Sequence, residues 1–278
     1  PPEFTRRVFR PLYFRVVSVY RIITEKCAAK GLLRARISDQ GGTNMKLRAL
    51  VVSDHESEYI WDYFDASVFK GVDVIVSCGD LKAEYLSFLV TMIPAPLLYV
   101  RGNHDGRYEQ NPPEGCIDLE EKPVVIKGVR FVGFGGCKCA KTEANHYSER
   151  DMARRVKRTE SLLTLQRKGF DVLVTHAPAA GLGDGDDSFH EGFTAFRTLI
   201  DRFQPRYHLH GHQHLSYSIG SKRVIEYNQT TIVNGFNYYL MDMEFVPQTA
   251  KKKPAEPLDV LKRKPPAPAK HELIKEKT

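Results

Sequence analysis

The chain has 278 residues, of which 42% are hydrophobic and 27% are charged, a balance that excludes collagen-like and wholly disordered proteins. Its formal net charge of +7 is concentrated at the two ends: residues 1–44 carry +6 and residues 247–278 carry +5, which leaves −4 on residues 45–246. Because the body is mildly acidic, nucleic-acid binding is not favoured, although the basic ends keep it as an alternative.

Residues 1–44 are predicted to be an extension outside the fold. The stretch from Phe9 to Leu33 is apolar and rich in arginine, and we expect a targeting segment, a membrane-surface helix or a non-native leader. Its arginines interrupt every apolar run before the roughly 18 residues that a membrane-spanning helix needs, so no transmembrane segment is predicted. Met45 leads directly into a first strand, and we expect the fold to start there.

Residues 45–246 are expected to form one α/β domain. Near-continuous apolar runs rich in β-branched residues predict strands that are covered on both faces of a sheet. These runs are Ala49–Ser53, Val72–Ser77, Leu97–Val100 and Asp171–Thr175. Helical periodicity covers Glu58–Lys70, Lys82–Ile93, Ser148–Lys168 and Gly192–Phe203. The alternation of strand and helix predicts parallel strands joined by crossover helices.

The pattern changes after Pro123. A hairpin is expected from residue 124 to residue 136 with its turn at Lys127-Gly128, and residues 207–245 have a strand-like pattern with turns near Gly220-Ser221 and Asn234-Gly235. These features predict a second, more antiparallel sheet. Residues 247–278, rich in lysine and proline, are expected to be a disordered basic tail.

The five cysteines do not have the spacing of a disulfide framework. A reducing compartment, the cytoplasm, is therefore expected unless the N-terminal extension is a targeting segment. Cys137 and Cys139 lack the second pair that a tetrahedral thiolate site would require, so we expect two loop thiols.

Metal-competent side chains follow each of the predicted buried strands. In open α/β sheets the carboxyl ends of the strands lie together, and ligand sites form there. The side chains are those of Asp54, His55, Glu56, Asp80, Asn103, His104, Asp105, His176, His212 and His214. Carboxylates, imidazoles and one amide suit Mn²⁺, Fe²⁺ or Zn²⁺ better than a soft metal that prefers thiolates. The sequence therefore predicts a divalent metal site.

The order of these motifs resembles the calcineurin-like metallophosphoesterase family over essentially all of residues 46–245. The motifs that carry the resemblance are Asp54, Gly79-Asp80, Gly102-Asn103-His104-Asp105, His176 and Gly211-His212-Gln213-His214. The resemblance implies a four-layer αββα sandwich with two metal ions at the strand ends.

The resemblance also implies a role for each matching residue. Asp80 would bridge the two ions, Asp54 and His214 would bind one of them, and the second would be held by Asn103, His176 and His212. His104 would touch the substrate phosphate or the leaving group, and Asp105 would orient His104.

Two bridged cations lower the pKa of a shared water and neutralise phosphate oxygens. The expected function is hydrolysis of a phosphodiester or phosphomonoester by metal-bound hydroxide, without a covalent phospho-enzyme. Mn²⁺ is the favoured ion, with Fe²⁺, Zn²⁺ and Mg²⁺ as alternatives. Two other functions stay open: a weakly active or inactive scaffold with the same fold, and a nuclease aided by the basic ends.

The first motif departs from the family pattern, which is usually Asp-x-His. Here Glu56 stands two residues after Asp54, and His55 stands one residue after it. Side chains two apart on a strand point the same way, so Glu56 is expected to be an oxygen ligand. His55 after a backbone shift, or neither residue, is the alternative. An oxygen ligand would favour Mn²⁺ or Mg²⁺ over Zn²⁺.

Several residues outside these motifs are also candidates. His146 and His190 lie on predicted loops and are expected to be surface or supporting residues, with substrate contact as the alternative. His210 is expected to support the metal ligands and His208 to pack in the core. Tyr59 and Trp61 are expected on the buried face of the first helix.

Overall fold

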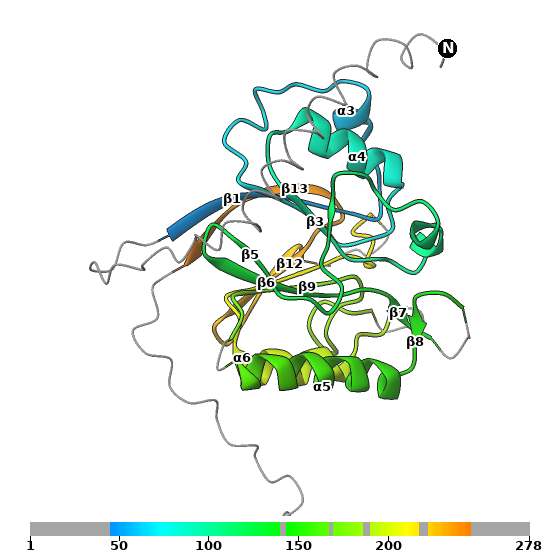
Figure 1. Ribbon diagram of the computed structural model, residues 1–278, viewed down its shortest axis with the longest axis vertical. Coiled ribbons are helices and arrows are strands. Elements are labelled where there is room, and N and C mark those ends of the chain that lie inside the picture. The colour runs from blue at the N-terminus through cyan, green and yellow to red at the C-terminus, as the bar shows by residue number, and fades with distance from the viewer. Residues whose placement is uncertain (1–44, 140–142, 167–168, 186–189, 217–221, 246–278) are drawn as a thin grey trace, which may run out of the picture.

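A computed structural model describes residues 45–139, 143–166, 169–185, 190–216 and 222–245. The predicted N-terminal extension and basic tail lie outside these ranges. Two β-sheets pack face to face, and helices cover the outer face of each, which gives the four layers of an αββα sandwich (Figure 1). The predicted fold class is confirmed.

The first sheet has five strands in the order β13-β1-β2-β3-β4. Its strands are β1 (Met45–Ser53), β2 (Val74–Ser77), β3 (Leu97–Tyr99), β4 (Ile117–Asp118) and β13 (Asn237–Phe245). Strands β1 to β4 are parallel, whereas β13 pairs antiparallel with the whole of β1, from Met45 opposite Phe245 to Ser53 opposite Asn237. Helices α3 (Glu58–Trp61) and α4 (Ala83–Met92) lie on its outer side (Figure 1).

The second sheet has six strands in the order β11-β12-β10-β9-β6-β5. Its strands are β5 (Val124–Ile126), β6 (Val129–Phe134), β9 (Val172–Thr175), β10 (Tyr207–His210), β11 (Val224–Tyr227) and β12 (Thr230–Asn234). The four central strands are parallel, and β5 and β11 are antiparallel to their neighbours. Helices α5 (Glu149–Leu165) and α6 (Thr194–Phe203) cover it, and β7 (Cys137–Lys138) pairs with β8 (His146–Tyr147) nearby.

Both faces of the central strands are buried, which explains their continuous apolar sequences. Along β1, Ala49 and Val51 face the core between the sheets, whereas Leu50 and Val52 face α3 and α4. A third cluster fills the space between the second sheet and its helices. Because the side chains at the centres of these strands leave water, the hydrophobic effect favours apolar residues there.

Several element predictions need correction. The helix predicted over residues 58–70 is wrong beyond Trp61, where α3 ends; the carboxylate of Asp65 accepts a hydrogen bond from the backbone N–H of Ser67 (2.8 Å), and such local bonds compete with the helical ladder. Strand β2 begins at Val74 rather than Val72, because the backbone N–H of Val72 turns back to Phe69.

The second sheet also differs from the prediction. Its centre is parallel, and β13, predicted to belong to it, joins the first sheet. The predicted turn at Lys127-Gly128 is confirmed. At Asn234-Gly235 the chain passes from β12 in the second sheet to β13 in the first without a turn, and the turn predicted at Gly220-Ser221 lies outside the described residues. Among the described helices, none is long and apolar enough to cross a membrane.

Candidate metal centre

The parallel strands of both sheets end at one edge, and the residues that follow them converge there. Asp54 follows β1, Asp80 lies just beyond β2, and His212 lies just beyond β10. These three residues have φ angles of 63°, 56° and 66°, in the left-handed region that non-glycine residues rarely occupy. Strained backbone of this kind clusters at functional sites, and here it turns the side chains away from the strand direction.

One group of donors could hold a cation. Asp80, His176 and His212 each offer a ligand atom, and these atoms lie within 4.8 Å of one another. The amide Oδ1 of Asn103 is 2.8 Å from Nε2 of His176, so it belongs to the same cluster. Nδ1 of His176 is 2.8 Å from the carbonyl oxygen of Cys78, a contact that aims Nε2 at the other donors. The donor set of carboxylate, amide and imidazoles fits a divalent ion.

A second donor pair lies beside the first group. The side chain of Asp54 is 1% exposed, and its oxygen Oδ1 lies 3.9 Å from Nε2 of His214. Both oxygens of Asp54 accept the backbone N–H of His212, at 3.0 and 2.9 Å. Burial raises the pKa of Asp54. The two groups of donors are therefore joined through the backbone of a shared loop.

Opposite charges are already paired in this cluster. Burial opposes ionisation of Asp80, but the charge of His176 and hydrogen bonds from His176 and His104 outweigh it and lower the pKa of Asp80 to about 2. Burial likewise disfavours protonation of His176, but Asp80 and Asp54 raise the pKa of His176 to about 9. A cation that binds here must displace a proton, which links its affinity to pH.

The loop after β3 is fixed by a buried carboxylate. Oδ2 of Asp105 accepts the backbone N–H groups of Asp80 (2.8 Å) and Gly102 (2.7 Å), and the N–H of His104 donates to Oδ1 of Asp80 (2.7 Å). Burial raises the pKa of Asp105 to about 6. The carboxylate of Asp105 thus orients the backbone of two loops. The sequence predicted instead that Asp105 orients the imidazole of His104, and His104 is exposed.

Glycine is required in this loop. A Cβ atom on Gly102 would overlap the carboxylate of Asp80, and one on Gly79 would overlap the backbone of Gly102. The two loops therefore approach each other closely because neither residue has a side chain.

Glu56 makes a different contact from the predicted one. Its Oε1 accepts the backbone N–H of Lys82 (3.0 Å), and its Oε2 lies 2.6 Å from Nζ of Lys82. Lys82 directly precedes α4, where an acidic group stabilises a helix. The predicted role of Glu56 as a metal ligand stays a prediction. His55 is exposed, and its ring centroid lies 6.2 Å from that of Phe236.

The other candidate histidines occupy distinct positions. The ring centroid of His190 lies 5.3 Å from that of His212, so His190 borders the cluster. Nδ1 of His146 is 2.9 Å from the carbonyl oxygen of Ala144. Burial lowers the pKa of His210 to about 4, and it lowers that of His208 as well. Both therefore stay neutral in the core.

Two aromatic predictions were wrong. Tyr59 is 43% exposed and Trp61 is 39% exposed, so they lie at the surface rather than in the core. Trp61 stacks on Tyr85, with ring centroids 5.2 Å apart. The chain turns after Trp61 instead of continuing as a helix, which leaves this ring at the edge of the packed layer.

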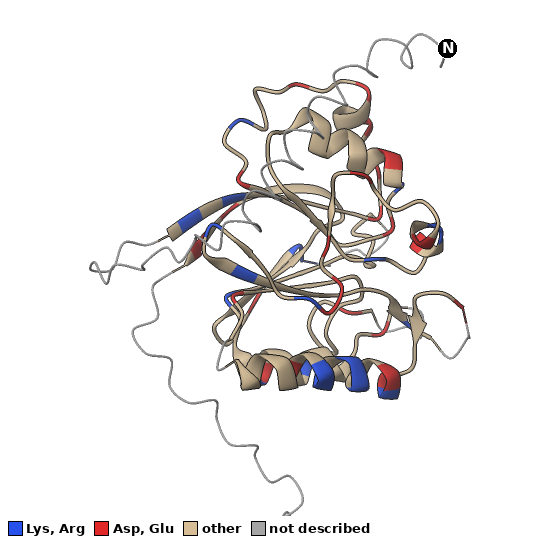
Figure 2. Ribbon diagram, in the orientation of Figure 1, with Lys and Arg blue, Asp and Glu red and all other residues tan. Residues whose placement is uncertain are grey.

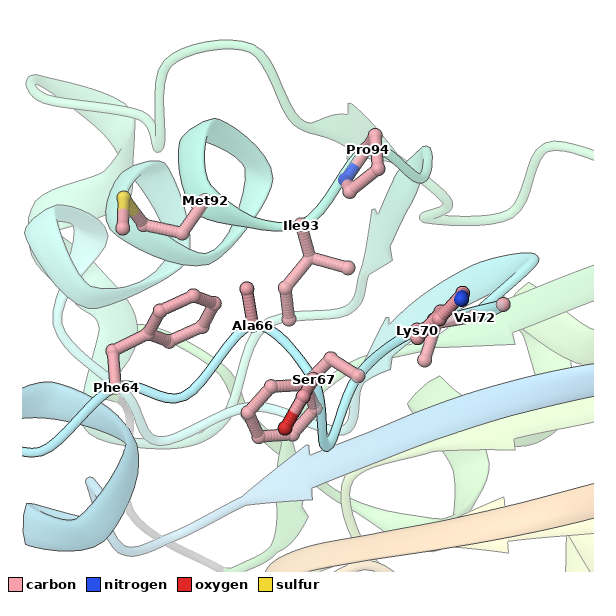
Figure 3. A pocket seen from close by; sticks show the side chains of 10 residues that line it. Phe64, Ala66, Ser67, Lys70, Val72, Met92, Ile93 and Pro94 are labelled. Atoms are coloured by element: carbon pink, nitrogen blue, oxygen red, sulfur yellow. The ribbon is translucent and has the colours of Figure 1, made fainter.

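An apolar hollow of about 380 Å³ lies elsewhere in the fold (Figure 3). Phe64, Met92 and Ile93 line it together with the segment from residue 69 to residue 72. These lining segments precede β2 and β3, so the hollow lies at the amino ends of those strands, opposite the polar cluster. It therefore does not contribute to the candidate centre.

The chain resembles several solved structures at low sequence identity. One crystal structure is 16% identical, with a TM-score of 0.53, and the match covers 74% of this chain and 100% of that chain. The protein TT1561 of Thermus thermophilus is also 16% identical, with a TM-score of 0.48 over 73% and 98% of the two chains. An archaeal phosphodiesterase is 12% identical, with a TM-score of 0.35 over 72% and 99%. No curated protein sequence matches the chain. The model of the calcineurin-like phosphoesterase family matches residues 47–216, more than half of the sequence, and the chain therefore belongs to that family.

Proposed function

We propose that the protein is a metal-dependent hydrolase that cleaves a phosphodiester or a phosphomonoester with two divalent ions. The observation that carries this proposal is the convergence of Asp80, His176 and His212 from loops after three strands, with ligand atoms within 4.8 Å of one another. A buried carboxylate and imidazoles gathered at the carboxyl ends of strands are a typical metal-assisted hydrolytic site.

The proposal gives each ion its own donors. One ion would be held by Asn103, His176 and His212. The other would be held by Asp54 and His214, and Asp80 would contribute to both sets. Glu56 would join the second set only if its contact with Lys82 breaks. Carboxylate-rich sets favour Mn²⁺, with Fe²⁺, Zn²⁺ and Mg²⁺ as alternatives. When bound, such ions polarise phosphate oxygens and lower the pKa of water.

The chain's own residues supply the remaining functions. His104 is exposed, and its backbone is fixed by the carboxylate of Asp80 (2.7 Å), so its imidazole can contact a bound ester. A protonated imidazole there would donate its proton to the departing oxygen. Asp105 holds the backbone of this loop in place. Water is the proposed attacking group, so the reaction needs no serine or cysteine nucleophile.

One observation favours a second function. Glu56 replaces the usual histidine and pairs with Lys82, which leaves the Asp54 and His214 set smaller than in the family pattern. A scaffold that binds one ion without catalysing hydrolysis would tolerate this change. The nuclease alternative has less support, because Figure 2 shows acidic and basic residues mixed along α5 and the strongly basic ends lie outside the described residues.

The test is a hydrolysis panel of mono-aryl and bis-aryl phosphates, with Mn²⁺, Mg²⁺ or Zn²⁺ added to metal-stripped protein. Asp80→Asn should abolish turnover and reduce metal content. His104→Ala should lower kcat by about 10²–10⁴-fold while metal content stays at the wild-type level, and His146→Ala is the matched histidine control. Metal binding without hydrolysis of any ester would favour the scaffold; full activity of His104→Ala would refute the catalytic assignment.

A further inference from the structure

An aromatic side chain borders the candidate centre on the side of the first sheet. The ring centroid of Phe236 lies 5.0 Å from that of His214, with the planes at 37°. The centroid of Phe236 also lies 6.2 Å from that of His55, with the planes at 48°. Phe236 is half-buried and His55 is exposed. Phe236 therefore neighbours both a proposed metal ligand and an exposed imidazole.

The backbone of Phe236 is held from several directions. Its N–H donates to Oδ1 of Asn234 (2.8 Å), and its carbonyl oxygen accepts the guanidinium of Arg223 (3.0 Å). Nδ2 of Asn234 in turn donates to the carbonyl oxygen of Gln213 (2.8 Å), between the two metal-binding histidines. Phe236 also forms a β-bridge with Ser53, next to Asp54. The backbone of Phe236 is thus held by the same loops that position the metal ligands.

The segment that carries Phe236, between β12 and β13, is tightly packed. The N–H of Gly235 donates to the carbonyl oxygen of His210 (2.7 Å), and a Cβ atom on Gly235 would come within 2.8 Å of the side chain of Val51. Tyr238, two residues further along the chain, stacks on the exposed ring of Tyr59 with centroids 6.4 Å apart. A second aromatic pair therefore joins β13 to α3.

A half-exposed aromatic ring beside a phosphate site can bind the organic part of a phosphate ester. Planar rings stack on aromatic side chains with a preference beyond simple area burial, and nucleic bases stack on them irrespective of their sequence. A positioned ring also reduces the entropy that binding costs.

We propose that Phe236, with His55, determines substrate specificity by stacking the planar ring of the alcohol part of the ester. The substrate class would then be phosphate esters of aryl or nucleoside alcohols rather than of alkyl alcohols. This inference rests on the proposed function, because it requires the phosphate to bind at the metal centre.

Binding of non-hydrolysable ligands tests this inference without turnover. Calorimetry on manganese-loaded full-length protein would compare phenylphosphonate with cyclohexylphosphonate, which have the same anionic group and similar apolar size but differ in planarity. We expect the wild type to prefer the phenyl ligand by about 3–10-fold. A second comparison measures the affinity for adenosine monophosphate and for ribose 5-phosphate, which lacks the base. It shows whether the site prefers a nucleoside ring or a simple aryl ring.

Variants assign the preference to the ring. Phe236→Leu should bring the phenyl-to-cyclohexyl ratio close to one, Phe236→Tyr should restore it, and Tyr63→Leu, at a ring that is 74% exposed, should leave it unchanged. His55→Ala, at an exposed position, should lower the ratio and serves as the test if Phe236→Leu does not fold.

Two negative results have different meanings. A wild-type ratio of one, or an unchanged ratio in both Phe236→Leu and His55→Ala, would overturn this inference alone. Failure of every phosphonate to bind the manganese-loaded protein would overturn the proposed function and this inference with it.

Discussion

A buried ion pair between α5 and the segment before β5 allows a direct test of stability. The side chain of Arg155, on α5, is 8% exposed and pairs with Glu120, which is 16% exposed. Its Nε donates to Glu121 (2.7 Å), its Nη1 donates to the carbonyl oxygen of Gly135 (3.2 Å), and its guanidinium carbon lies 4.3 Å from the ring centroid of Tyr147. Arg155 thus links α5 to the loop after β6.

Arg155→Met should cost about 3–5 kcal/mol of unfolding free energy, because it leaves the carboxylate of Glu120 buried without its partner. Typical domains have only about 5–15 kcal/mol in total. The deficit should shrink as the pH falls: burial already raises the pKa of Glu120, and once protonated the group carries no uncompensated charge. In the double variant with Glu120→Gln, we expect recovery of at least about 1.5 kcal/mol.

Denaturant unfolding followed by circular dichroism would measure these differences. Arg158→Met is the matched control, because Arg158 is 64% exposed and contacts the same Glu121 at 3.1 Å. Exposed pairs contribute about 0–1 kcal/mol, so this variant should be nearly as stable as the wild type. A loss below about 1 kcal/mol for Arg155→Met, or strict additivity in the double variant, would refute the reasoning.

Three further predictions concern other parts of the structure. Burial opposes ionisation of Asp73, but the hydrogen bond and charge of Lys127, at the β5–β6 turn, outweigh it and lower the pKa of Asp73. The stability that this pair contributes is present at neutral pH and is lost as the pH falls through the lowered pKa. Between pH 6 and 3 the wild type should therefore lose about 0.5–1 kcal/mol more than Asp73→Asn in urea unfolding. Glu56→Gln should lower the unfolding free energy by about 1 kcal/mol through its contact with Lys82, and an accompanying loss of manganese by elemental analysis would show that Glu56 also binds metal. Gly102→Ala should lower metal content, because its Cβ would overlap the carboxylate of Asp80; wild-type content in a folded variant would contradict this reasoning.

The sequence predicted the ends of the buried strands because two signals agree there. A continuous apolar run can form only inside a covered sheet, and a polar, metal-competent residue directly after it marks where the strand leaves the core. Asp54 and His176 meet both conditions, and Asp80 follows three residues after its strand. The assignment of strands to sheets was less accessible, because β13 follows the strands of the second sheet in sequence but pairs with β1, nearly two hundred residues earlier.

The prediction for Glu56 shows where periodicity stops applying. Side chains two residues apart point the same way only while the backbone stays extended. Asp54 has a φ angle of 63°, so the alternation ends at that residue, and Glu56 is directed to Lys82. The same holds for His212, with a φ angle of 66°, which separates it from His214. Sequence gives no direct signal for this change, since aspartate and histidine occur at ordinary strand ends as well.

Phe236 could not be assigned to the centre from sequence. The sequence predicted a turn near Asn234-Gly235. That Phe236 neighbours Ser53, however, is known only once β13 is paired with β1. Long-range pairing of this kind depends on which sheets close the core, and local residue patterns do not encode it.

The loops of the candidate centre support one another before any ion binds. The N–H of Asp54 donates to the carbonyl oxygen of Gly79 (3.1 Å), the N–H of Asp80 donates to Asp105 (2.8 Å), and the N–H of His212 donates to Asp54 (2.9 Å). Each of the three residues with a left-handed backbone is thus held by a hydrogen bond to another loop of the site. Since a strained conformation persists only where its surroundings determine it, the motifs of this chain depend on one another for geometry as well as for chemistry. Loss of one carboxylate should therefore disturb the neighbouring loop as well as remove a donor to the ion.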